Sequence, residues 1–123
     1  MSSMVYSKRS QVPRFGKWLR ELREQKGLPL RAVAAAADMD QASLSKAELG
    51  QRLLTEEQTA LLAKFFGVDA NEAEGRRLAE KFRHETESNP GAARHALYIL
   101  AEQAGIYGGQ RKKSGLRAGG GVR

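Results

Sequence analysis

The chain has 123 residues, no cysteine and a formal net charge of +7. This length predicts one domain with short extensions, and the lack of cysteine excludes disulfides, thiolate metal sites and a cysteine nucleophile. No segment is long and apolar enough to span a bilayer, and the N-terminus lacks the apolar stretch of a signal peptide. We therefore expect a cytoplasmic protein without a membrane segment.

The excess positive charge lies at the two ends of the chain. Residues 1–14 carry +3 and residues 108–123 carry +5, whereas residues 15–69 are neutral and residues 70–107 carry −1. Basic ends bind phosphate backbones without reading sequence, but they also serve solubility alone, and both interpretations stay open here. We interpret residues 1–12 as a flexible basic arm and residues 108–123 as a disordered, basic, glycine-rich tail.

Apolar spacing and the positions of glycine and proline predict an all-α chain. The first helix is expected over about 13–26, with Phe15, Leu19 and Leu22 on one face. A short second helix is expected over about 29–37, with proline in its first turn. Its face is made of small residues, which lets another helix approach closely.

Capping signals divide the rest of the chain. Asp40 is a good N-cap for a third helix over about 41–49. Thr55 and Gln58 form a capping box at the start of the fourth helix, which ends at Gly67. The fourth helix is expected to bury one apolar face, consisting of Leu61, Leu62, Phe65 and Phe66. Further helices are expected over about 70–87 and from Pro90 to near Gln103.

Residues 31–52 place a short helix, a tight turn and a second short helix in succession. Two helices that cross at about 90–120° need small residues where they touch, and Ala34 meets that need. The helix over 41–49 then presents short polar side chains on its outer, N-terminal side, where they can bond to base edges. Its N-terminal amides are also expected to favour a phosphate.

The stretch FGKWLRELREQKGLPLRAVAAAADMDQASLSKAELGQR resembles the XRE (Cro-repressor-type) group of helix-turn-helix regulators. The resemblance covers about residues 14–69, including FFGVD at 65–69. The residues that carry it are Leu19, Arg20, Arg23, Ala34, Leu44, Ser45, Glu48 and Gly50. It implies a lambda-repressor-like helix-turn-helix bundle of about five helices, here with an additional C-terminal helix. It also implies a bacterial, nucleoid-associated protein that binds double-stranded DNA.

Four positions depart from the family pattern. Asp38 replaces the usual turn glycine, but aspartate tolerates left-handed backbone better than most residues. Leu30 replaces a polar residue, which removes one expected phosphate contact and leaves Arg31 as a substitute. Ala47 replaces a bulky aliphatic residue, so we expect looser packing behind the third helix. Leu49 replaces a commonly basic or polar residue, and it is expected to be either packed or exposed near the following loop.

The base-reading residues predicted on this helix are Gln41, Ala42, Ser43 and Lys46. Glutamine can form two hydrogen bonds with adenine, and lysine suits guanine, although a phosphate contact is the alternative for both. The residues predicted to contact the DNA backbone are Arg14, Lys17, Arg31, Ser45 and Arg52. The resemblance implies that Arg23 and Glu48 form a structural ion pair between the first and third helices.

Residues 70–107 supply more apolar side chains than a minimal domain needs. They are Leu78, Phe82, Leu97, Ile99, Leu100, Ile106 and Tyr107. These residues either cap the core or form an isologous dimer interface, and we favour the dimer because one short helix makes few contacts with DNA. A two-fold dimer predicts half-sites about 10–10.5 bp apart, or a multiple of that.

The leading hypothesis is a sequence-specific transcriptional regulator that represses as a dimer. The alternative is a protein-interaction module, such as an antitoxin or a bridging coactivator, for which DNA contact is secondary. No catalytic constellation, phosphate-binding glycine loop or metal-ligand spacing predicts an enzyme, and we expect no cofactor. His84 and His95 lie on separate predicted helices without further ligands, so no metal site is expected.

Overall fold

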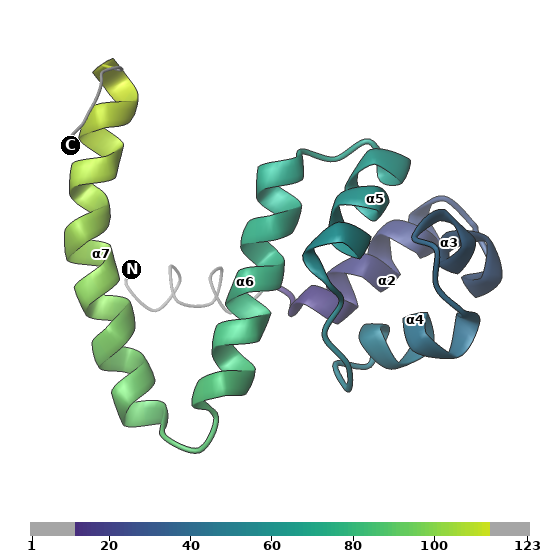
Figure 1. The fold of residues 1–123 in the computed structure, drawn as a ribbon, viewed down its shortest axis with the longest axis horizontal. Helices are drawn as coiled ribbons and strands as arrows, with labels where there is room; N and C mark the ends of the chain where they lie inside the picture. Colours follow the sequence, from purple (N-terminus) through teal and green to yellow (C-terminus); the bar gives the residue numbers. More distant parts are fainter. Residues whose placement is uncertain (1–11, 114–123) are drawn as a thin grey trace, which may run out of the picture. The chain divides into compact units, whose positions relative to one another are not determined.

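The computed structural model describes the backbone of residues 12–113 and the side chains of residues 12–105. Within that range the chain forms six helices and no strand. Figure 1 draws them as a ribbon. They are α2 (Phe15–Gln25), α3 (Leu30–Ala36), α4 (Gln41–Glu48), α5 (Glu56–Phe66), α6 (Ala70–Thr86) and α7 (Pro90–Lys113). The all-α prediction is confirmed. The chain divides into a first compact unit that ends at His84 and a second that begins at Glu85.

The helices begin where the local capping signals place them. The Asp40 carboxylate accepts the backbone N–H of Ser43 at 2.6 Å at the start of α4. At the start of α5, Thr55 and Gln58 exchange two hydrogen bonds of 3.0 Å in the predicted capping box. Asp38, before α4, has a φ of +57°, so it adopts the left-handed backbone expected at the turn. The hydrogen bonds at Asp40 and Thr55 satisfy backbone N–H groups that the start of a helix leaves unpaired.

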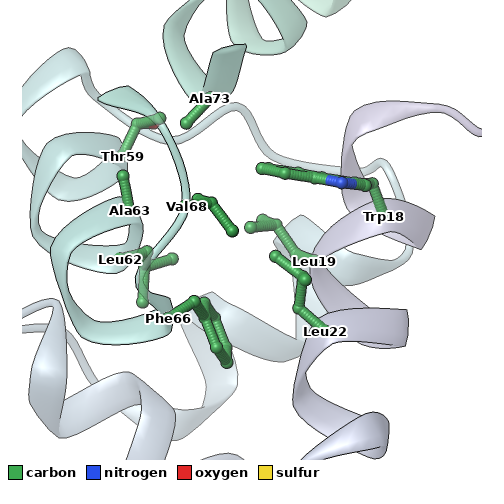
Figure 2. Close-up of a pocket in the computed structure, with 9 residues that line it drawn as sticks. All are labelled: Trp18, Leu19, Leu22, Thr59, Leu62, Ala63, Phe66, Val68 and Ala73. Atoms are coloured by element: carbon green, nitrogen blue, oxygen red, sulfur yellow. The ribbon is translucent and has the colours of Figure 1, made fainter. Parts of the chain in front are cut away.

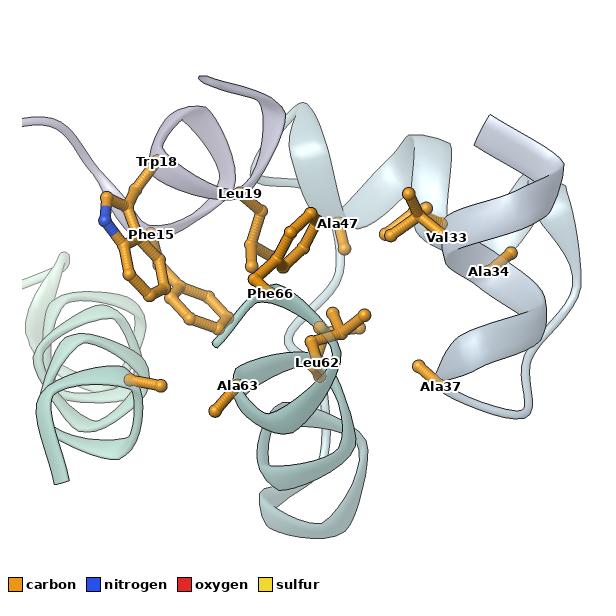
Figure 3. Close-up of a cluster of buried hydrophobic side chains, with 13 residues drawn as sticks. Phe15, Trp18, Leu19, Val33, Ala34, Ala37, Ala47, Leu62, Ala63 and Phe66 are labelled. Carbon is orange, nitrogen blue, oxygen red and sulfur yellow. The ribbon is translucent and has the colours of Figure 1, made fainter. Parts of the chain in front are cut away.

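The core of the first unit lies where α2, α3, α4 and α5 meet (Figure 3). Helix α4 contacts both α2 and α3, and α3 also contacts α5. The buried hydrophobic residues are Phe15, Trp18, Leu19, Val33, Ala34, Ala37, Leu44, Ala47, Leu54, Leu62, Ala63, Phe66 and Ala73. Alanines make up much of the α3 and α4 contribution, which allows these two short helices to pack closely.

The predicted apolar face of α5 was wrong for two of its four residues. Leu62 and Phe66 are buried, but Leu61 and Phe65 are 42% and 43% exposed. Successive residues of an α-helix differ by about 100° in direction, so positions 61 and 65 lie to one side of positions 62 and 66. Thr59 and Ala63 complete the inward face instead.

The first turns of α6 belong to the first unit. Ala73 is part of the core, and the guanidinium of Arg76 lies over the Trp18 ring, 4.6 Å from its centroid. Arg77 donates to the carbonyl oxygen of Leu54 at 3.4 Å. The division that the sequence suggested between residues 69 and 70 therefore falls inside this unit.

Helix α7 continues to Lys113, so the end predicted near Gln103 was wrong. The glycine-rich composition after Tyr107 was interpreted as disorder, but a glycine inside a helix costs only about 1 kcal/mol relative to alanine. Residues 108–113, predicted as the start of a disordered tail, are therefore helical. The rest of that tail, residues 114–123, and residues 1–11 of the basic arm lie outside the described residues.

We predict that Leu44→Ala destabilises the domain by about 2–5 kcal/mol, because the Leu44 side chain is fully buried and its loss leaves a cavity. The matched control is Leu49→Ala, at the end of the same helix, where leucine is 61% exposed and the expected change is below about 0.5 kcal/mol. Urea unfolding followed by circular dichroism measures both. Equal destabilisation by the two substitutions would contradict the placement of α4.

Candidate nucleic-acid interface

Helix α4 lies at the edge of the first unit, with one side turned away from the other helices of that unit (Figure 1). It buries Leu44 and Ala47. Gln41, Ala42 and Lys46 are exposed on the opposite side, while Ser43 and Ser45 are half-buried. Four-residue spacing aligns Gln41 with Ser45, and Ala42 with Lys46, so these four residues share one outer face.

Two residues, one in α4 and one at its end, differ from the prediction of which side chains face DNA. Ser43 lies at the margin of the outer face, and its backbone N–H is already bonded to Asp40. Leu49, which was not among the candidates, is 61% exposed and follows Gln41 and Ser45 in the same row. An exposed leucine there offers an apolar contact of the kind that a thymine methyl accepts. The sequence had left open whether Leu49 is packed or exposed, and no contact with DNA was predicted for it.

The Asp40 carboxylate occupies the N-terminus of α4. Hydrogen bonds from the backbone and side chain of Ser43 lower the pKa of Asp40, and the positive charges of Lys46 and Arg52 lower it further. Asp40 is therefore ionised at neutral pH, and its charge repels an anion at this end of the helix. The charge of Asp40 works against the phosphate that the N-terminal amides of α4 were expected to favour, and that expectation stays a prediction. Arg52, by contrast, lies near this end of α4, as its effect on Asp40 indicates.

The other end of α4 is fixed to α2 by an ion pair between Arg23 and Glu48. Arg23 donates to both carboxylate oxygens, from Nε at 2.8 Å and from Nη2 at 3.0 Å, and it also donates to the carbonyl oxygen of Leu28 at 3.1 Å. The hydrogen bonds to Glu48 raise the pKa of Arg23 despite its partial burial. A two-point arginine–carboxylate pair restricts orientation as well as distance. The contact therefore constrains the direction of α4.

Packing behind α4 is close, so the looser packing expected at Ala47 was wrong. Ala47 is buried, and the helix backbone at this position lies directly against Gly16 of α2. The lack of a side chain on Gly16 brings the two helices near enough for alanine to fill the space. The apolar residue at position 30, where the family pattern has a polar one, is also explained by packing. Leu30 is partly buried and packs against the core.

Arg14, predicted to contact the DNA backbone, forms an ion pair with Glu80 of α6. Its Nε donates to Glu80 Oε1 at 3.3 Å, and its Nη2 donates to Oε2. His84 Nε2 lies 2.8 Å from the same Oε2. Arg14 is also the residue nearest to a methyl group placed on Gly50, with Nη2 at 3.7 Å, so its half-exposed guanidinium lies beside the end of α4.

Glu80 is only 5% exposed although it is charged. Burial by itself raises the pKa of this carboxyl, but the hydrogen bonds and charges of Arg14 and His84 outweigh burial and lower it. This contact could not be predicted from local sequence, because Arg14 and Glu80 are 66 positions apart. Lys17 and Arg31, the remaining predicted backbone contacts, are exposed on α2 and α3, and their role stays a prediction.

A shallow apolar hollow between α2 and α5 is lined by side chains that fill it, and it has no space for a water molecule (Figure 2). The Thr59 hydroxyl, which is among its lining groups, donates to the carbonyl oxygen of Thr55 at 2.9 Å. Within the part of the chain that the structure describes, no cluster of metal-ligating side chains occurs, and no helix is long and apolar enough to cross a membrane.

The arrangement is that of two short helices, α3 and α4, joined by a tight turn, with α4 presented outward. Residues 14–75, just over half of the chain, match the family model of the helix-turn-helix domain. The chain therefore belongs to the helix-turn-helix domain family, a class typical of non-enzymatic DNA-binding regulators, and DNA is the partner this class indicates. No curated protein and no solved structure matches the chain.

We predict that Glu80→Gln flattens the decline of stability with acid. Because the pKa of Glu80 is lowered in the folded state, its contribution is present above the ordinary carboxyl pKa and is lost as the pH falls below it. The wild type should therefore lose stability more steeply than the variant between about pH 5 and pH 3. Thermal unfolding across this range measures the difference.

The control for this prediction is Glu87→Gln, which removes the same charge from an exposed position between α6 and α7. It should leave the acid profile of the wild type unchanged. A Glu80→Gln profile parallel to that of the wild type would show that the contact with Arg14 contributes nothing to folding.

Proposed function

We propose that this protein is an XRE-type transcriptional regulator that reads double-stranded DNA with α4 in the major groove and represses as a dimer. The observation that carries the proposal is the outer face of α4, which presents the exposed Gln41 and Lys46 and is fixed from behind by the Arg23–Glu48 pair. An α-helix fits the major groove, where each base pair presents its own pattern of donors and acceptors. A rigidly held helix can place its side chains reproducibly against that pattern.

Affinity and specificity come from different residues in this proposal. Lys17, Arg31 and Arg52 bind phosphates and give affinity that falls steeply with salt. Gln41, Ala42 and Lys46 contact base edges, and Gln41 fits adenine because its amide can donate and accept at once. Ser45 contacts the DNA backbone, and Ser43 reaches a base from the margin of the face. Arg14 contributes at the phosphate beside the end of α4 while it remains paired with Glu80.

The dimer uses apolar residues within the segment 70–107, chiefly those on α7. Leu97, Tyr98, Ile99 and Leu100 are 53–68% exposed. Four successive residues point to all sides of a helix, and a helix that is apolar all round is normally buried. A second copy of the chain supplies matching helices without another gene product, and it doubles the contacts that one short α4 makes.

We predict that Gln41→Ala and Lys46→Ala each relax the base preference at one position of the selected site, at a cost of about 1–3 kcal/mol. The measurement is selection of bound sequences from random duplex DNA at about 150 mM salt, where backbone contacts alone bind weakly. A palindromic motif is expected from the wild type. Gln25→Ala and Lys64→Ala, on α2 and α5, remove the same groups elsewhere and should leave the motif unchanged.

If the selected DNA contains no common motif, the proposal that α4 reads base sequence is contradicted. The protein would then be a nonspecific DNA binder or an interaction module whose main partner is another protein.

We predict that the double substitution Leu97→Lys with Leu100→Lys converts a dimer to a monomer, because each lysine would place a charge in the apolar interface. Sedimentation equilibrium measures the change in mass. Leu61→Lys is the matched control, since Leu61 is also exposed but lies on α5 of the first unit. If Leu61→Lys dissociates the dimer and the α7 variant does not, the interface lies on the first unit.

A further inference from the structure

Gly16 lies where the backbones of α2 and α4 come close together. It is the second residue of α2 and is buried. A methyl group placed on it would lie 2.7 Å from the carbonyl oxygen of Glu48 and closer still to that of Ala47. Real Cβ atoms essentially never come within 3.0 Å of another heavy atom, and these are backbone atoms that no side-chain rotation can move away. Any residue larger than glycine therefore forces the two helices apart.

The same end of α4 is held by Arg23, seven residues along α2. Seven residues correspond to about two helical turns, so Gly16 and Arg23 lie on the same side of α2. Arg23 holds the carboxylate of Glu48, and Gly16 meets its backbone carbonyl. The ion pair draws α4 toward α2, while the contact at Gly16 limits how near it comes. The two contacts together fix a distance that neither fixes alone.

We propose that Gly16 is a positioning residue, which sets how far α4 stands from α2 and therefore where its outer face meets the bases. This inference rests on the function proposed above and names a specificity determinant that touches no DNA. Hydrogen bonds to base edges require placement within about 0.5 Å, which is less than the shift that a methyl group at Gly16 imposes. Long lysine and arginine side chains can follow a phosphate through such a shift.

The test is Gly16→Ala, compared with Gly75→Ala. Gly75 is also inside a helix, α6, but a methyl group there meets nothing within 4 Å, so the control makes the same chemical change without the clash. Binding is measured to the duplex that the wild type selects and to a scrambled duplex at the same salt. We expect Gly16→Ala to lower the ratio of the two affinities about ten-fold or more, and Gly75→Ala to leave it unchanged. A folded Gly16→Ala protein with the wild-type ratio would overturn the proposal.

A second measurement needs no DNA. Backbone amide chemical shifts of Gly16→Ala should differ from those of the wild type mainly over residues 41–50, and much less over residues 56–66 of α5. Changes confined to α2, or spread evenly over the domain, would overturn the proposal. If the wild type prefers no sequence, the proposed function fails, while the shift pattern still decides whether Gly16 positions α4.

Gly16→Ala must be folded for both measurements. Gly75→Ala is expected to raise helix stability, since alanine is the better helix former at an open site, and it provides a more stable background for the substitution. Circular dichroism should show native helix content for Gly16→Ala in that background. Failure to fold even there would mean that Gly16 is required for the fold as a whole and would overturn a positioning role.

Discussion

The contact between α2 and the end of α4 is the constraint on which the outward face of α4 depends. Helix α4 has only eight residues, and a helix of that length is not stable by itself in water. Its inward side contributes only two buried residues, Leu44 and Ala47. Apolar packing of that size does not fix a direction, because it is nearly indifferent to small rotations. The two-point pair of Arg23 with Glu48 is directional, and it supplies the orientation that the small apolar contact lacks.

Polar contacts also join α6 to the rest of the first unit. Ala73 is the one core residue that α6 contributes, and arginine side chains make the remaining connections described above. One of them pairs Arg14 with Glu80, whose carboxylate is buried. A buried charge is costly unless it is paired, so this contact favours one placement of α6 over others in which Glu80 would be buried alone. The ion pair therefore connects Arg14, which directly precedes α2, to Glu80 within α6.

Sequence reasoning was most successful where the signal is local. Capping at Asp40, Thr55 and Gln58, and the left-handed turn at Asp38, depend on residues within three positions of one another, so the starts of α4 and α5 could be predicted closely. It was least successful where an outcome depends on distant residues. Nothing near Glu80 in the sequence indicates that it meets Arg14, and nothing near Gly16 indicates that α4 lies against it.

Some features of the candidate site could likewise be predicted from local sequence, and others needed the structure. The helical position of Gln41, Ala42 and Lys46 follows from residue spacing, and their exposure follows from which residues of α4 are buried. The effect of Asp40 on an anion at the helix start needed the geometry of its hydrogen bonds, because the same aspartate is both a cap and a charge. Leu49 shows a different limit, since the sequence left open whether this leucine is packed or exposed, and only the structure places it outside.

The second unit poses a problem that the first does not. A glycine-containing helix as long as α7 gains little from propensity, and most helical stability in proteins comes from packing of an apolar face. Leu97, Tyr98, Ile99 and Leu100 supply such surface, yet all four are exposed in the single chain. In the proposed dimer, covering these residues would add to the stability of α7. Association and the stability of the second unit would then be coupled, and the fraction of dimers would depend on protein concentration.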